Sequence, residues 1–161
     1  MTPPPKTTPR RAGASEDWAA VLRLIRDSFA AMADRIDPPS SMHELTEAGI
    51  AAQNTTGEVW LIGTHPVACV FLTVKPPALY LGKLAVVASQ RRNGLARALI
   101  TLAGVRARAL GLTALELQTR VELTENHATF AALGFLETRK TAHIGYDRPT
   151  SLTLQRPVPP I

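Results

Sequence analysis

Hydrophobic residues near the start of the chain recur at the three- and four-residue spacing of an amphipathic helix. They are Trp18, Val21, Leu22, Ile25 and Phe29. Ser15 precedes this run, and a serine at that place can cap a helix by accepting a backbone hydrogen bond. We therefore predict a helix from Ser15 to about Ala33, preceded by a short edge strand around residues 7–12.

A proline pair separates this helix from the middle of the chain. Pro38 and Pro39 hold the backbone extended, so a second helix should begin only where Ser40 or Ser41 can cap it, and should end near Asn54. The pattern then changes to short apolar runs separated by turns, which is typical of strands. The runs cover residues 59–62, 67–74 and 78–87. They predict a three-stranded meander.

Helical spacing returns after the meander. Residues 95–109 present one apolar face, and Gly111 should end this helix in a left-handed conformation. A strand over residues 112–118 follows directly. A helix, a short turn and a strand in that order favour a strand parallel or adjacent to residues 78–87. The remaining expected elements are a short helix over 126–133 and a closing hairpin of residues 135–143 and 151–156.

The composition suits a single domain. With 161 residues, 45% of them hydrophobic, the chain can bury a sizeable core, and we expect one domain over 7–156 with disordered tails at 1–6 and 157–161. The lone cysteine, Cys69, lies in an apolar run and is predicted to be a core residue. Neither a signal peptide nor a membrane span is apparent, so we expect a cytoplasmic protein with no membrane partner.

The net charge of +5 and an isoelectric point near 10 are compatible with nucleic acid, a membrane surface or a small polyanion as partner. The loop Arg91–Ala96, between an apolar strand and a helix, favours the small polyanion. Free backbone N–H groups at a helix start suit phosphate oxygens, and Gly94 allows close approach. The loop has neither a Walker lysine nor a G-x-G-x-x-G pattern.

Two motifs make the chain resemble the GNAT superfamily of acyltransferases. The pattern Arg91-x-x-Gly94-x-Ala96 is similar to the acyl-CoA loop of that family, and Asn126–Phe135 is similar to its helix that ends in Leu-Gly-Phe. The resemblance implies a single-domain α/β (α+β) fold with a mixed, largely antiparallel sheet of about six to seven strands flanked by four helices. It implies a sheet splayed between the fourth and fifth strands, and acetyl-CoA as cosubstrate without a metal.

The resemblance also implies an N-acetyltransferase in which a primary amine attacks the thioester directly. Backbone groups at the end of the fourth strand would hold the pantetheine and stabilise the oxyanion, and amides of the loop would hold the pyrophosphate. The implied cofactor-binding residues are Val86, Val87, Arg91, Arg92, Asn93, Gly94, Leu95, Ala96, Arg97 and Asn126.

The chain departs from the family at the proton donor. Phe130 stands where the family often has a tyrosine that protonates the leaving thiolate. Asn126 lies closer to that position than the asparagine of the family does, and capping of the helix fits it about as well as cofactor binding. Glu116 and Tyr80 are the candidate general bases, although a surface carboxylate and a packing tyrosine are the structural alternatives.

The acceptor amine is expected between the loop joining the first two helices and the closing hairpin. The candidate substrate-binding residues are Arg35, Asp37, Ser40 and Tyr146. The arginine suits a carboxylate and the aspartate suits an ammonium group, and both lie in polar loops of a kind common on any surface. An amino acid, a polyamine, a peptide N-terminus and a lysine all remain compatible as small-molecule or peptide acceptors.

Two other functions fit parts of the sequence. Phe130 is compatible with a non-catalytic acyl-CoA-binding module. Arg97 and Arg108 share a helix face that would suit a basic nucleic-acid-binding protein, but few aromatic residues are available for base stacking, and we expect no nucleic-acid partner. The oligomeric state stays open, with a homodimer as the commonest closed assembly.

Overall fold

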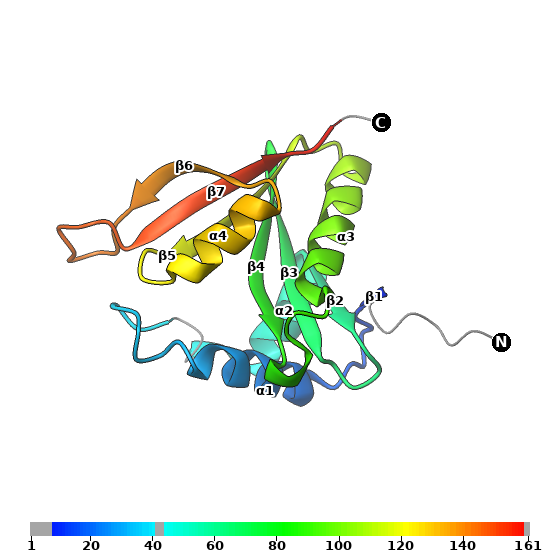
Figure 1. Cartoon of the computed structure of the whole chain (residues 1–161). Coiled ribbons are helices and arrows are strands. Elements are labelled where there is room, and N and C mark those ends of the chain that lie inside the picture. Colours follow the sequence, from blue (N-terminus) through cyan, green and yellow to red (C-terminus); the bar gives the residue numbers. More distant parts are fainter. Residues whose placement is uncertain (1–7, 41–43, 160–161) are drawn as a thin grey trace.

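The chain forms one seven-stranded sheet with helices on both faces (Figure 1). The computed structural model describes residues 8–40 and 44–159. The strands are β1 (Pro9–Arg11), β2 (Glu58–Ile62), β3 (Ala68–Lys75), β4 (Ala78–Val86), β5 (Ala114–Arg120), β6 (Leu136–Thr141) and β7 (Ser151–Pro157). The helices are α1 (Trp18–Ala30), α2 (Glu47–Thr56), α3 (Leu95–Ala109) and α4 (Thr124–Ala132), with a short 3-10 helix, η2 (Ala88–Gln90).

The strand order is β1-β2-β3-β4-β5-β7-β6, and β4–β5 is the parallel pair among antiparallel neighbours. This topology confirms the fold class inferred from the sequence. It also confirms the meander, which is β2–β3–β4, and the crossover through α3 that makes β5 parallel to β4. The predicted left-handed residue after α3 is confirmed as well, since Gly111 has φ +75°.

The starts of the first two helices differ from the prediction. Asp17, not Ser15, caps α1 by accepting a hydrogen bond from the amide of Ala20 at 3.1 Å. Thr46 caps α2 by accepting one from Gly49 at 3.0 Å, so this helix begins later than a cap at Ser40 would allow. Ser41, the other predicted cap, lies outside the described residues.

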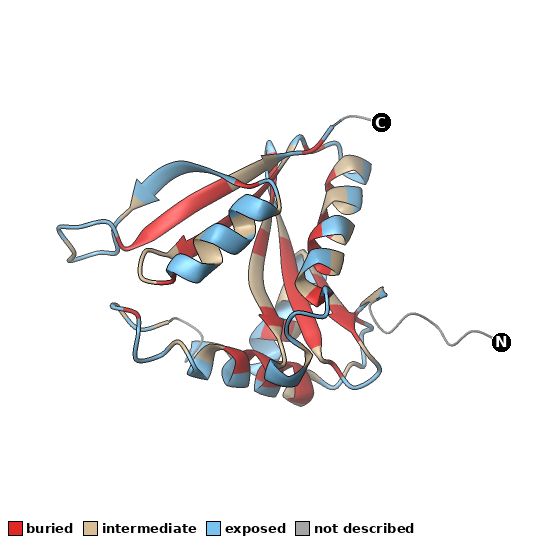
Figure 2. Cartoon of the chain, viewed as in Figure 1, coloured by how far each residue is buried: buried red, intermediate tan, exposed pale blue. Residues whose placement is uncertain are grey.

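The two faces of the sheet carry separate hydrophobic cores (Figure 2). Helices α1 and α2 pack against β2 to β4 on one face, and α3 packs against β3 to β5 on the other. Phe135, after α4, is 2% exposed and lies in the α3 core, while Cys69 is fully buried in the α1 core. Burial raises the pKa of the Cys69 thiol to about 12, which confirms that it is a core residue and not a nucleophile.

The C-terminal strand extends further than the sequence indicated. β7 includes Pro157, and the amide of Val158 donates to the carbonyl of Thr113 at 2.8 Å. The side chain of Val158 is only 8% exposed, because it packs in the α3 core. A disordered tail from 157 onward is therefore wrong for residues 157 and 158.

The parallel pair β4–β5 opens after three rungs. Its register joins Ala78–Tyr80 to Ala114–Glu116, and beyond these the two strands have no pairing with each other. β4 also carries a bulge, where the register with β3 shifts between Cys69 and Phe71 and Lys83 has φ +49°. The bulge bends β4 away from β5, so the sheet is splayed between its fourth and fifth strands as expected.

Candidate active site

A cavity of about 430 Å³ occupies the opening between β4 and β5. Its walls come from β4, β5 and α4 with the turn before it, and from the parts of α1, α2, β3 and the β6–β7 end that face them. Among the lining residues are Phe29, Met32, Ser40, Tyr80, Lys83, Leu84, Thr119, Arg120, Asn126, Phe130 and His143. A volume of this size is typical of a site for a small molecule or part of a cofactor.

The start of α3 presents unused backbone donors. Gly94 caps the helix in the left-handed region with φ +78°, and the first helical bond runs from the amide of Ala98 to its carbonyl at 2.9 Å. The amides of Leu95, Ala96 and Arg97 therefore precede the first helical hydrogen bond, as at any helix start. A Cβ atom added at Gly94 would meet nothing within 4 Å, so the space before these amides is open.

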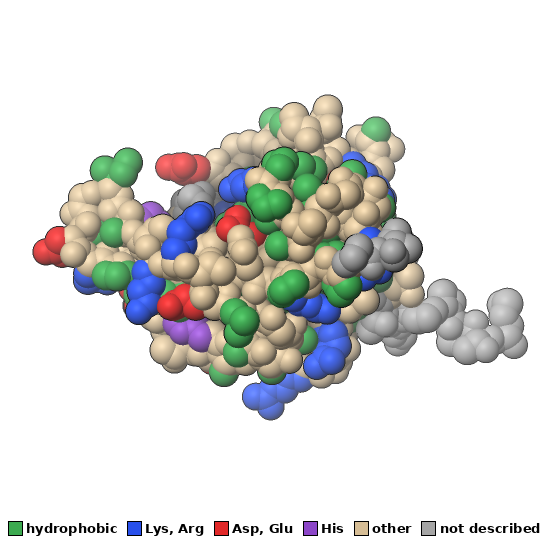
Figure 3. Space-filling model, turned by 90° about the horizontal axis from the view of Figure 1, so that it is seen from above, with side chains coloured by type: hydrophobic (Ala, Val, Ile, Leu, Met, Phe, Trp, Pro, Cys, Tyr) green, Lys and Arg blue, Asp and Glu red, His purple; other side chains and the backbone are tan. Residues whose placement is uncertain are grey.

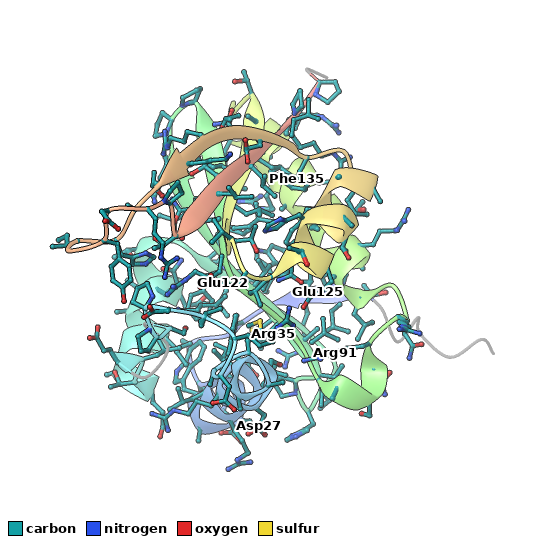
Figure 4. All side chains as sticks on the ribbon, turned by 60° about the vertical axis from the view of Figure 1, so that its left-hand side comes forward. Asp27, Arg35, Arg91, Glu122, Glu125 and Phe135 are labelled. Atoms are coloured by element: carbon teal, nitrogen blue, oxygen red, sulfur yellow. The ribbon has the colours of Figure 1, made fainter. Side chains whose placement is uncertain are left out.

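Arg91 points away from this concavity. Its guanidinium Nη2 donates to the carbonyl of Ser28 in α1 at 3.4 Å, and Figure 4 shows it beside that helix. The Ser28 hydroxyl, 8% exposed, donates to the carbonyl of Val86 at 3.1 Å. Ser28, which the sequence did not single out, thus ties α1 to the end of β4 and to the loop.

The backbone of Val86 is placed differently from that of Val87. The amide of Val87 donates to Val67 at 2.8 Å, and its carbonyl accepts from Gln90 at 3.0 Å, so both groups are used within the protein. Because amides alternate in direction along a strand, that of Val86 points away from β3, toward the opening. Of the two valines predicted to bind the cofactor, Val86 has the suitable donor.

The two predicted bases lie side by side but differ in access. Tyr80 pairs with Glu116 across the last rung of β4–β5, and Tyr80 lines the cavity whereas Glu116 does not. Burial, and secondarily the Glu116 carboxylate, raise the pKa of the Tyr80 phenol, so it stays protonated at neutral pH. Glu116 is 8% exposed and accepts a hydrogen bond from Gln155 at 3.2 Å, with Arg139 3.9 Å away.

Three of the four predicted acceptor residues form contacts that join the segment after α1 to other parts of the chain. Arg35 forms an ion pair with Glu125 and donates to the carbonyl of Glu122 at 3.4 Å (Figure 4). The Tyr146 hydroxyl donates to Asp37 at 2.6 Å. The Arg35 guanidinium lowers the pKa of the Glu125 carboxyl to about 2. Because these contacts bridge the segment after α1 to both β5–α4 and the β6–β7 end, they fix the width of the cavity on this side.

Ser40, the fourth predicted acceptor residue, lines the cavity. The connection that carries it is fastened by Arg120, which donates to the carbonyls of Pro38 at 2.6 Å and Pro39 at 3.1 Å. The β6–β7 end that faces this connection projects from the body of the molecule, with acidic, basic and hydrophobic side chains together near its tip (Figure 3). The predicted acceptor residues are therefore brought together by contacts between distant parts of the chain. No local sequence pattern predicts these contacts.

His143 is a titratable residue of the cavity wall. We assign the ring proton of His143 to Nδ1, because the Thr150 hydroxyl, which contacts that nitrogen, gives its hydrogen to the carbonyl of Thr141 at 3.4 Å and accepts from the amide of His143 at 2.9 Å. This leaves the lone pair on Nε2. Desolvation and the nearby Arg120 lower the pKa of His143, against an opposing effect of Glu122, so the ring is neutral at pH 7.

Comparison with known families decides the class of the protein. The family model described as "Acetyltransferase (GNAT) family" matches residues 18–135, which is more than half of the chain. The chain belongs to the GNAT family. The predicted enzyme class, an acyl-CoA-dependent N-acetyltransferase, is thereby confirmed. No curated protein matches the sequence.

Solved structures show the same GNAT fold at low sequence identity. The ribosomal-protein-S18-alanine N-acetyltransferase from Escherichia coli is 20% identical, with 94% of this chain and 93% of that one covered and a TM-score of 0.68. A GNAT acetyltransferase from Staphylococcus aureus Mu50 is 14% identical, covering 94% and 99%, with a TM-score of 0.74. The PaiA N-acetyltransferase from Thermoplasma acidophilum, solved with coenzyme A, is 9% identical, covering 92% and 97%, with a TM-score of 0.76.

Helix α4 corresponds to the GNAT helix that ends in Leu-Gly-Phe, and it has Phe130 where the family often has a tyrosine. It begins at Thr124, so Asn126 lies inside the helix and the capping alternative is wrong; Asn126 lines the cavity instead. Phe130 also lines the cavity, and its ring packs edge-on against Phe135 with centroids 5.9 Å apart. A phenyl ring has no proton to donate, so Phe130 cannot protonate the leaving thiolate.

The part of the chain that the structure describes has neither a helix suited to crossing a membrane nor a cluster of side chains suited to holding a metal ion. None of the helices at 8–40 and 44–159 is both long and apolar enough to cross a membrane. No group of three or more His, Cys, Asp or Glu side chains in the same part of the chain is arranged to hold a metal ion.

Proposed function

We propose that this GNAT protein transfers the acetyl group of acetyl-CoA to a primary amine by direct attack. The observation that carries the proposal is the alignment of three features: the open amides at the start of α3, the amide of Val86 at the end of β4, and the cavity between the splayed strands. The amides at the start of α3 are donors for the pyrophosphate of the cofactor, and the amide of Val86 is a donor for its thioester end.

The protein contributes mainly position and electrostatics in this proposal. The amides of Arg92 and of Gly94 to Arg97 hold the pyrophosphate at the positive end of the α3 dipole, whereas that of Asn93 donates to the carbonyl of Gln90 at 3.4 Å. The amide of Val86 donates to the thioester oxygen and stabilises the negative charge that develops on it. Tyr80 and Ser40 lie on the wall where the acceptor enters, and the bridge around Arg35 and Asp37 sets the space for it.

We assign the general base to His143 rather than to Tyr80 or Glu116. Its Nε2 carries a lone pair at neutral pH, since Nδ1 is held by Thr150, and its ring lines the cavity. The phenol of Tyr80 stays protonated, and Glu116 is beside the cavity and already bonded to Gln155. Once the neutral amine has attacked, His143 accepts a proton from the cationic nitrogen of the tetrahedral adduct, directly or through one water.

His143→Gln should change the pH dependence of kcat/KM. With an acceptor amine that titrates well above pH 8, log kcat/KM rises with slope one as the amine loses its proton. Below the lowered pKa of His143 a second proton blocks the reaction, so the wild-type slope should increase to two at acid pH. The variant should be about 10²-fold slower at neutral pH and keep slope one throughout. Stopped assays of thiol release from pH 5 to 9 measure both.

His65→Gln is the matched control for this profile. His65 is exposed in the turn between β2 and β3, away from the cavity, and its replacement should leave the rate and the acid slope as in the wild type. A His143→Gln enzyme that keeps the wild-type profile would exclude His143 as the base and return the role to Glu116 acting through water.

Release of free thiol from acetyl-CoA across a panel of amines tests the proposed function. The panel should contain amino acids, polyamines, peptides with free N-termini and lysine peptides, because both cationic and carboxylate-bearing acceptors suit the charged residues around the cavity. Turnover with one class and acetylation of its amine are the expected results. Binding and thermal stabilisation by acetyl-CoA without thiol release on any amine would favour the non-catalytic module, and absence of binding would exclude both.

A further inference from the structure

The hydroxyl of Thr119 is buried in the cavity without a hydrogen-bond partner. Thr119 lines the cavity, its side chain is 7% exposed, and its Oγ1 is one of two buried polar side-chain atoms that find no partner among the described residues. The other is Oε1 of Glu122, which does not line the cavity. Proteins rarely leave a buried hydroxyl unbonded, because it has lost its bonds to water.

The position of Thr119 along β5 shows what the hydroxyl faces. The last rung of the parallel pair joins Tyr80 to Glu116, and three residues further along each strand lie Lys83 on β4 and Thr119 on β5. Thr119 is thus level with the bulge of β4, on the opposite side of the opening. Val86 follows Lys83 by three residues on the same strand, so the hydroxyl lies in the opening toward which the amide of Val86 also points.

Two neighbouring side chains, Phe130 and Gln118, supply no donor at this point. Phe130, at the family's usual tyrosine position, has no polar hydrogen. Gln118 precedes Thr119 and therefore points to the opposite face of β5, where its Nε2 donates to Thr153 at 3.4 Å. Thr119 shares its face with Leu115 and Leu117, which lie in the α3 core together with Phe130. Thr119 thus places a hydroxyl on the same side of the sheet as the ring of Phe130, which stands at the family's usual tyrosine position.

We propose that Thr119 donates a hydrogen bond to the sulfur of acetyl-CoA as the thioester breaks, a role that rests on the proposed function. The amine nitrogen forms a bond to the acetyl carbon, the C–S bond breaks, and its electron pair stays on sulfur as a thiolate. Thr119 keeps its proton and stabilises that thiolate by the hydrogen bond. The proton of the new ammonium goes to His143 or water, and the thiolate takes its proton from solvent.

Thr119→Val tests this role because valine keeps the shape and removes the hydroxyl. The variant should fold, with a Tm no lower than that of the wild type, since an unbonded buried hydroxyl is replaced by a methyl group. We expect kcat to fall about tenfold while KM for acetyl-CoA stays within about twofold, because the bond is strongest when sulfur carries charge. Thr119→Ser, which restores a hydroxyl, should recover most of the lost kcat.

A binding measurement gives a readout that a merely structural role would not move. Wild-type protein should bind CoA more tightly than desulfo-CoA, in which hydrogen replaces the thiol, and the preference should increase with pH as the thiol ionises. Thr119→Val should bind desulfo-CoA like the wild type and lose both the preference and its pH dependence. Equal kcat values for the variant and the wild type, or an unchanged preference for CoA, would overturn the proposal.

These outcomes are separate from a failure of the proposed function. If the wild type binds CoA and releases thiol but Thr119→Val does the same equally well, the acetyltransferase proposal stands and the role of Thr119 falls. If the wild type binds neither CoA nor desulfo-CoA, the proposed function itself fails. A Thr119→Val protein whose Tm falls by several degrees, with Thr119→Ser equally impaired in kcat, would assign Thr119 to packing and overturn the catalytic role.

Discussion

Gly94→Val is expected to lower the affinity for acetyl-CoA about 10³-fold, which corresponds to about 4 kcal/mol. A Cβ at this position enters the open space before the amides of Leu95, Ala96 and Arg97, where the pyrophosphate should lie. Two or three charge-assisted hydrogen bonds, each worth about 1.5–3 kcal/mol, would be lost or lengthened. Calorimetric titration of acetyl-CoA measures the change.

Two variants make the Gly94 result specific. Arg91→Ala should weaken binding by less than about tenfold, because the Arg91 guanidinium is bonded to Ser28 and the amides provide most of the affinity. Gly111→Val carries the same backbone strain at the other end of α3, with φ +75° and an equally open Cβ position, and should bind acetyl-CoA like the wild type. A larger loss for Arg91→Ala than for Gly94→Val would contradict the amide-based account.

Phe135→Ala is expected to lower the free energy of unfolding by about 3–5 kcal/mol. Phe135 is 2% exposed in the α3 core, and its ring also supports Phe130 edge-on at 5.9 Å. Removing the ring leaves a cavity between α4 and the sheet that backbone shifts fill only in part. Because Phe130 lines the active-site cavity, the affinity for acetyl-CoA should fall as well. Urea denaturation followed by tryptophan fluorescence measures the stability.

Leu136→Ala, at the next residue, controls for the Phe135 variant. Leu136 begins β6 with its side chain 70% exposed, so its truncation should change the free energy of unfolding by less than about 0.5 kcal/mol. Comparable losses at the two positions would show that the α4–β6 junction, rather than the Phe135 ring, determines stability.

The periodic elements of the fold were predictable from the sequence, and the choice between neighbouring caps was not. Apolar spacing placed α1, α3 and the meander because those faces pack directly on the sheet. Ser15 and Asp17 are both good caps by residue type. Glu16 decides between them, since its carboxylate accepts hydrogen bonds from Arg10 at 2.9 Å and Gly13 at 3.1 Å and keeps the chain non-helical up to Asp17.

The cofactor side of the site was more predictable than the acceptor side. Gly94 and the residues after it form a local motif, and the start of a helix needs no distant partner. His143 and Thr119 acquire their properties from distant contacts: Thr150 holds the imidazole, and the opening of β4–β5 leaves the hydroxyl unbonded. Thr119 gave one weak signal, since it follows Leu115 and Leu117 at strand spacing as a polar residue on an apolar face.

The roles of the residues on the acceptor side also depend on contacts between distant parts of the chain. Arg35 and Asp37 were recognised as charged residues beside prolines, but a sequence does not reveal that Glu122, Glu125 and Tyr146 bind them. These partners lie more than 80 positions away along the chain. Because of these partners, Arg35 and Asp37, which the sequence suggested as substrate ligands, form a bridge across the cavity instead. Ser40 and Tyr80 lie on the cavity wall.

Titration of acetyl-CoA and of S-acetylpantetheine into the wild type and Gly94→Val measures what the amides at the start of α3 contribute, because the smaller ligand has the thioester but lacks the pyrophosphate. We expect micromolar binding of acetyl-CoA to the wild type and binding of S-acetylpantetheine about 10³-fold weaker. Gly94→Val should bind both ligands equally weakly. Equal affinities of the wild type for the two ligands would contradict the binding of the pyrophosphate by these amides.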